Sequence, residues 1–196
     1  DLHKAIRRQR QMCIRDSTGM RLRLIVMNFL QFAVWGAYLT SMGTYLFNIG
    51  LGAKIGLFYA MQGIVSLFMP AIMGIIADRW VPAQKLYGFC HFMAAVFMVA
   101  AGWYGYVDGE AVNFGTLFTF YSLSVAFYMP TLALTNSVAY TALDKVKLDP
   151  VIAFPPIRIF GTIGFICSML LTDILGFQNN YMQFFSCCLL YTSDAA

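Results

Sequence analysis

Three side chains with complementary binding chemistry lie within one strongly apolar stretch of the sequence. Arg158, Thr162 and Phe165 are spaced four and three residues apart, which places them on one face of a helix. The guanidinium offers a fixed fork of donors, the hydroxyl can donate or accept, and the ring offers a stacking surface. Besides Arg158, the apolar run from Pro156 to Gly176 contains one further ionisable side chain, Asp173. These three side chains are therefore candidates for binding a polar substrate.

The position of Arg158 leaves a second interpretation open. Proline suits the first turn of a helix, so Pro155 and Pro156 predict that the helix begins there. An arginine about one turn further on could extend its long side chain back to the membrane interface. A charged group deep in an apolar segment more often faces a polar cavity or a partner. The residues alone favour neither of these two roles over the other.

Polar and aromatic residues recur at helical spacing in three other apolar stretches. The sets are Asn28, Gln31, Trp35 and Tyr38; Tyr59, Gln62 and Ser66; and Tyr121, Ser124, Tyr128, Thr131 and Thr135. Such residues can simply bond across packed membrane helices, at about 0.6–2 kcal/mol each. Together, however, they predict a shared wet cavity, and amides beside aromatic rings suit a flat, polar, uncharged ligand. From the first set we predict that Gln31 and Trp35 bind substrate.

The elements that must position these residues are membrane-spanning helices. The chain is 60% hydrophobic and 11% charged, with apolar blocks about twenty residues long. The predicted blocks are 24–47, 55–77, 86–107, 114–139 and 156–176, and a sixth begins near Tyr181. Each complete block can cross a hydrocarbon core of about 30 Å as a helix. The predicted fold is all-α and polytopic, with five complete helices and part of a sixth.

The basic residues indicate orientation in a membrane better than nucleic-acid binding. The net charge is +4, but most Lys and Arg side chains precede or separate the apolar blocks. One side of the predicted bundle collects Arg21, Arg23, Arg79, Lys85, Lys145 and Lys147, whereas the other has Lys54, Asp108 and Glu110. Because cytoplasmic loops carry the positive excess, we predict a cytoplasmic N-terminus and no nucleic-acid partner.

The two ends of the sequence look foreign to this pattern. Residues 1–19 and 187–196 resemble translated sequencing adapters, so we expect both segments to be non-native and residues 20–186 to form the transmembrane unit. Without the first segment no cleavable signal peptide remains. The five cysteines show neither metal spacing nor a disulfide framework, so we expect no metal site.

A charged pair follows the second apolar block. Asp78 and Arg79 lie near the end of the segment GIIADRW, where an acid can pair with a base or a helix N-terminus across a cytoplasmic gate. This segment resembles the G-x-x-x-D-R signature of the loop between helices two and three in the major facilitator superfamily. The resemblance implies a gating role for Asp78 and Arg79.

Four segments together carry a narrower resemblance. They are RLRLIVMNFLQFAVWGAYLTSMGTYLF, SLFMPAIMGIIADRW, FYMPTLALTNSVAY and FPPIRIFGTIGF, in this order and at transmembrane spacing. They resemble the nucleoside:proton symporter family of that superfamily over nearly all of residues 20–185. The resemblance implies the N-terminal six-helix half of a twelve-helix transporter, built from inverted three-helix repeats around a midplane site. It also places Arg158 in the central substrate cavity, with Thr162 and Phe165 on the same face.

The function that the resemblance implies is import of nucleosides by proton symport with alternating access, in a bacterial inner membrane. The partners would be the nucleoside, the proton as coupling ion, the lipid bilayer and the missing C-terminal half, with no other cofactor. We expect the fragment to be inactive alone. Two alternatives stay open: a major facilitator transporter of another small polar solute, or a membrane-embedded enzyme or assembly subunit. No nucleophile with a base or paired carboxylates supports an enzyme.

Overall fold

Helices form all the regular structure in residues 2–108 and 112–195, the residues that this computed structural model describes. The α-helices are α1 (Leu2–Leu39), α2 (Ser41–Asn48), α3 (Ile55–Arg79), α4 (Ala83–Asp108), α5 (Phe114–Lys145), α6 (Pro150–Ile174) and α7 (Met182–Ala195). Short 3-10 turns, η1 (Gly52–Lys54) and η3 (Phe177–Asn179), precede α3 and α7. Glu110, used above to predict orientation, lies outside the described residues.

Five helical segments are long and apolar enough to cross a membrane. They cover Thr18–Asn48, Gly52–Arg79, Ala83–Asp108, Phe114–Lys145 and Pro150–Ile174. The first combines part of α1 with α2, and the Tyr59 hydroxyl donates to the Leu39 carbonyl, 2.6 Å away, where α1 ends. The predicted five spans and partial sixth helix, α7, are confirmed. The fourth span was predicted to end at Ala139, but α5, which includes Pro130, continues to Lys145.

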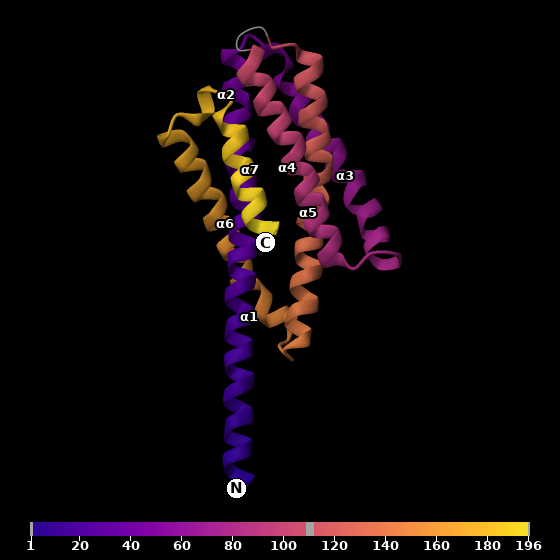
Figure 1. The fold of residues 1–196 in the computed structure, drawn as a ribbon, viewed down its shortest axis with the longest axis vertical. Helices are drawn as coiled ribbons and strands as arrows, with labels where there is room; N and C mark the ends of the chain where they lie inside the picture. The colour runs from indigo at the N-terminus through magenta and orange to yellow at the C-terminus, as the bar shows by residue number, and fades with distance from the viewer. Residues whose placement is uncertain (1, 109–111, 196) are drawn as a thin grey trace.

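The helices pack as a bundle in which α1 lies along α6, while α4 contacts both α5 and α7 (Figure 1). Helix α3 packs mainly on α5, and α1 also contacts α7. Large side chains from α1, α2, α4 and α5 fill the space between them, among them Tyr38, Met42, Met98, Tyr121 and Tyr128, all fully buried. The long α1 projects beyond the other helices toward the N-terminus (Figure 1).

Helix α6 begins six residues earlier than predicted. The Asp149 side chain caps it by accepting from the Val151 N–H at 2.9 Å, and Pro150 occupies the first turn. The proline pair therefore lies inside the helix. It frees the carbonyls of Val151 and Ile152, two residues that are 79% and 74% exposed; such carbonyls are tolerated where water, side chains or a neighbouring helix can bond them.

This start changes the depth of Arg158. Eight residues separate Pro150 from Arg158, which corresponds to about 12 Å along the helix axis. The prediction of a position one turn from the helix start is wrong. More than two turns of helix now separate the Arg158 backbone from the start of α6, which favours a role within the bundle.

Glycines allow α1 and α6 to lie unusually close together. A Cβ atom on Gly36 would overlap the Phe165 carbonyl, and one on Gly164 would overlap the Phe29 carbonyl. Since both obstacles are backbone atoms, neither can move aside without moving a helix. The glycines of FGTIGF therefore set the distance between the two helices.

We predict that Gly164→Ala lowers the melting temperature of the purified protein in detergent. Overfilling a packed contact typically costs about 1–3 kcal/mol. Gly63→Ala is the matched control, because nothing lies within 4 Å of a Cβ atom there. Equal melting temperatures for the two variants would contradict a glycine-determined contact.

Candidate functional site

Arg158 lies over an aromatic ring and has no acidic partner among the described residues. Its Cζ atom is 3.8 Å from the centroid of the Phe32 ring, in cation–π geometry. The side chain is only partly buried, and no described residue bonds to it or forms an ion pair with it. Gly161 makes this arrangement possible, since a Cβ atom there would come within 2.7 Å of the Phe32 ring and 2.9 Å of the guanidinium. Most of the donor fork is therefore available to a ligand.

Aromatic rings from α1 and α6 continue the surface beside Arg158. Trp35 meets Phe165 edge-on with 5.9 Å between ring centroids, and Phe32 lies 6.2 Å from Trp35. The Trp35 Nε1–H is buried but has no hydrogen-bond partner in the part of the chain described here. Since buried donors are nearly always bonded, this indole N–H is a donor that a ligand could satisfy.

A hollow of about 300 Å³ opens between α1, α3, α5 and α6 at this place. Its lining is Phe32, Trp35, Ser66, Pro70, Met129, Leu132, Ala133, Asn136 and Arg158. Two of the predicted site residues, Arg158 and Trp35, therefore line one cavity, together with the exposed carboxamide of Asn136. A guanidinium, an amide and rings around one hollow can hold a small, flat, polar molecule.

The other two predicted residues of α6 lie just outside this hollow. Thr162 is exposed one turn beyond Arg158, with no described residue bonded to its hydroxyl. Phe165 is partly buried through its contact with Trp35. Their predicted contact with substrate stays a prediction.

Among the residues of the hollow that sequence reasoning did not select, Phe32 and Asn136 matter most, because one lies under Arg158 and the other adds a carboxamide. Asn136 directly follows Thr135, the last member of the polar set on α5, but it does not share the helical spacing of that set. Every member of that set on α5 is buried between helices, so the prediction that it lines a wet cavity is wrong. Ser124, for example, donates to the Ala94 carbonyl of α4 at 2.8 Å. The signal for Asn136 was its position one residue away from this packed face.

Gln31 lies behind the hollow, fully buried between α1, α4 and α5. Its carboxamide nitrogen donates to Thr131 Oγ1, and its carboxamide oxygen meets the Tyr87 hydroxyl and His91 Nε2, each at 2.8 Å. His91 is also fully buried. The predicted contact between Gln31 and substrate stays a prediction, but in this conformation both polar atoms of the side chain bond to protein.

The proposed gate residues lie at the end of α3. Asp78 and Arg79 are both exposed, and neither forms an ion pair within the described ranges 2–108 and 112–195. Gly74, one turn earlier, has open space at its Cβ position. No described residue of this chain opposes the pair, so their gating role stays a prediction.

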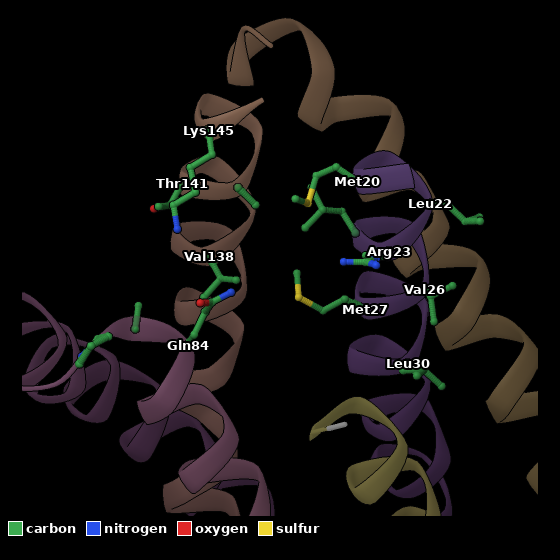
Figure 2. Close-up of a pocket in the computed structure, with 14 residues that line it drawn as sticks. Met20, Leu22, Arg23, Val26, Met27, Leu30, Gln84, Val138, Thr141 and Lys145 are labelled. Carbon is green, nitrogen blue, oxygen red and sulfur yellow. The ribbon is translucent and has the colours of Figure 1, made fainter. Parts of the chain in front are cut away.

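A larger cleft lies away from these residues, between α1, α5 and the start of α4 (Figure 2). It encloses about 880 Å³ and is lined by Met20, Leu22, Arg23, Leu24, Val26, Met27, Leu30, Pro82, Ala83, Gln84, Val138, Thr141, Ala142 and Lys145. Arg23 points across it toward the α5 side (Figure 2). The lining is mostly apolar and contains none of the predicted substrate-binding residues, so we do not assign the cleft as the site.

Neither metal nor disulfide chemistry is supported in the described residues. They contain no group of three or more His, Cys, Asp or Glu side chains able to hold a metal ion. Cys90, Cys167, Cys187 and Cys188 are free thiols. The site therefore offers hydrogen bonds, charge and ring surfaces.

Five helical segments able to cross a membrane, with a hollow between α1, α3, α5 and α6, define a polytopic membrane protein with a candidate binding site. The profile of the family described as nucleoside H+ symporter matches residues 18–192. The chain belongs to this family.

Individual relatives agree with the family match. Xanthosine permease of Escherichia coli (strain K12) is 40% identical over 169 residues, covering 85% of this chain and 39% of that protein. Nucleoside permease NupG of the same organism is 38% identical over 170 residues, with the same two coverages, 85% and 39%. The crystal structure of nucleoside transporter NupG matches 90% of this chain and 42% of its own, with 36% identity and a TM-score of 0.82.

These comparisons confirm the predicted fold class, an all-α, polytopic part of a major facilitator transporter. The chain spans about two fifths of the length of the relatives it matches, 39% in both permeases. The match begins at residue 18, close to the predicted boundary at Met20. That boundary itself stays a prediction, because α1 is continuous from Leu2.

We predict that Arg158→Ala leaves the melting temperature in detergent nearly unchanged. The side chain makes one favourable protein contact in the described structure, the cation–π contact with Phe32, worth about 0.5–2 kcal/mol. Removing a partly desolvated charge offsets part of that loss. A drop as large as that of Gly164→Ala would instead indicate that Arg158 holds the bundle together.

Proposed function

We propose that the whole protein imports nucleosides by proton symport, with alternating access to a site between two halves of the molecule. The observation that carries this proposal is Arg158, whose backbone lies more than two turns from the start of α6. Its guanidinium lies over the Phe32 ring and has no acidic partner among the described residues. Membership of the nucleoside H+ symporter family and the names of the permeases support the same substrate class.

The site matches the chemistry of a nucleoside. Ribose hydroxyls and base carbonyls accept hydrogen bonds, so the Arg158 fork and the Trp35 N–H can donate to them. The flat base can pack against the Trp35 or Phe165 ring. The Asn136 carboxamide both donates and accepts, which suits the edge of a base.

The remaining predicted residues complete this proposal. Thr162 extends the polar face of α6 toward the same substrate. We also assign Gln31 to the site, although its side chain lies behind the hollow. Asp78 and Arg79 gate the cytoplasmic side by meeting residues of the other half. Their exposure leaves both side chains accessible for such contacts.

The coupling ion is a proton, and no cofactor is needed. Asp173, the acid of α6, bonds to Gln178 near the far end of the helix, away from Arg158. We therefore place the proton-coupling acid in the part of the protein beyond this chain. Exposed apolar side chains on α3 and α6, such as Leu67, Phe68 and Ile159, face the bilayer or the other half.

The protein resides in a bacterial inner membrane with its N-terminus in the cytoplasm, as the distribution of Lys and Arg predicts. Transport of another small polar solute is the second candidate, because guanidinium and amide groups recognise many such molecules. The enzyme and assembly-subunit alternative loses its support, since the matched relatives are named as permeases and a transporter.

Uptake of radiolabelled nucleosides by the full-length protein tests this function. Wild type should accumulate nucleoside only with an inward proton gradient, and the 196-residue chain alone should not. Arg158→Ala should reduce uptake at least tenfold, since hydrogen bonds to charged groups contribute about 1.5–3 kcal/mol. Arg158→Lys should recover little, because a single ammonium cannot reproduce the fork.

Two results would contradict the proposal. Normal uptake by a folded Arg158→Ala variant would show that the guanidinium does not bind substrate. Failure of wild type to take up any nucleoside, with uptake of another solute, would favour the second candidate.

Asn136 provides an independent test of the hollow. We predict that Asn136→Ala raises the dissociation constant for nucleoside about 2–10-fold, the usual range for one neutral hydrogen bond. Ser137→Ala is the control, because Ser137 is exposed on the next position of α5 but does not line the hollow. Titration calorimetry on purified protein measures the dissociation constants of both variants. An equal effect of the two substitutions would show that Asn136 does not contact the nucleoside.

A further inference from the structure

The buried bonds around Gln31 fix which way its carboxamide points. The Thr131 hydroxyl gives its own proton to the Tyr128 carbonyl at 2.6 Å, so its oxygen must accept from Gln31. The amide nitrogen of Gln31 therefore faces Thr131, and the amide oxygen faces Tyr87 and His91. Since that oxygen carries no hydrogen, His91 must carry a proton on Nε2. Tyr87 and His91 thus fill both lone pairs of the Gln31 oxygen.

The same residue is held through its backbone. The Tyr128 hydroxyl donates to the main-chain carbonyl of Gln31 at 2.6 Å. In an α-helix this carbonyl also accepts from the residue four positions on, which is Trp35. Side chains of α4 and α5 therefore grip α1 at one residue, directly before Phe32 and one turn before Trp35.

We propose that His91 and Tyr87 are positioning residues for the substrate site, acting through Gln31. By binding the Gln31 carboxamide, they fix the rotation of α1 about its axis, and this rotation presents Phe32 and Trp35 to Arg158. Gln31 then serves the site by holding α1, without touching the nucleoside. This role rests on the proposed function for its physiological meaning, but its structural part can be tested without substrate.

Removing the His91 donor should disturb this arrangement in a specific way. His91→Leu leaves one lone pair of a buried amide oxygen unbonded, which is unfavourable in a dry interior. His91→Gln keeps an N–H donor at a similar reach from the backbone. We therefore expect the leucine variant to lose the rotational setting of α1 and the glutamine variant to retain it.

Ser124→Ala is the matched control. Ser124 also forms a buried bond between α5 and α4, to the Ala94 carbonyl, but it does not contact Gln31. A general weakening of helix packing should therefore appear in this variant as well. An effect confined to His91→Leu must come from Gln31 and α1.

The substrate-free readout is Trp35 fluorescence in full-length protein in which Trp35 is the sole tryptophan, with Trp80→Phe, Trp103→Phe and phenylalanine at every tryptophan beyond residue 196; the Trp80 and Trp103 rings are exposed. We expect acrylamide quenching of Trp35 to increase in His91→Leu and to stay at the wild-type value in His91→Gln and Ser124→Ala. Unchanged quenching in a folded His91→Leu variant would overturn the positioning role. Equal loss in the leucine and glutamine variants would overturn the role of the N–H donor.

The substrate readout is nucleoside affinity measured by titration calorimetry on the same proteins. His91→Leu should bind about tenfold more weakly than wild type, consistent with one unsatisfied buried acceptor. His91→Gln should bind within about threefold, within one modest hydrogen-bond difference. A fluorescence change without an affinity change would overturn the link to the substrate site. A wild-type protein that binds no nucleoside would instead refute the proposed function, while the fluorescence result still decides the positioning role.

Discussion

The close contact between α1 and α6 determines the rest of the site. Gly36 and Gly164 bring each helix against backbone carbonyls of the other, and Gly161 leaves room for the Phe32 ring beneath Arg158. A side chain at any of these glycines would separate the ring from the guanidinium. Arg158 can thus lie within the bundle, partly buried, because the Phe32 ring of α1 supplies a π-surface and no side chain intervenes between the two helices.

Polar groups in and behind the hollow fall into two sets with different tasks. Helices in lipid gain little from burying apolar surface against each other, so packing and interhelical hydrogen bonds hold them together. Gln31, Tyr128 and Thr131 bond to one another and belong to this first set. Trp35 and Arg158 line the hollow, and among the described residues neither the buried indole N–H nor the guanidinium has a hydrogen-bond partner. Hydrogen-bond donors that have no protein partner and lie beside aromatic rings mark the surface where a ligand can bind.

The sequence predicts the spans well because length and apolar composition alone decide whether a helix crosses a membrane. The sequence predicts less well which neighbouring helix the polar face of a given helix contacts. Gln31 and Trp35 share a face, yet one lies between α4 and α5 while the other lines the hollow, since a helical face can contact several neighbours. The start of α6 was misplaced because the Asp149 cap and Pro150 outweigh the more conspicuous proline pair. Contacts across helices, such as Phe32 under Arg158, leave no mark in spacing along one chain.

The most direct test is an experimental structure of the full-length protein with a bound nucleoside. The account predicts that the Arg158 guanidinium donates to the nucleoside, that the base contacts Phe32, Trp35 or Phe165, and that Gln31 stays bonded to Tyr87 and His91. A nucleoside bound away from α6, with the Arg158 side chain extended to the membrane interface, would contradict it.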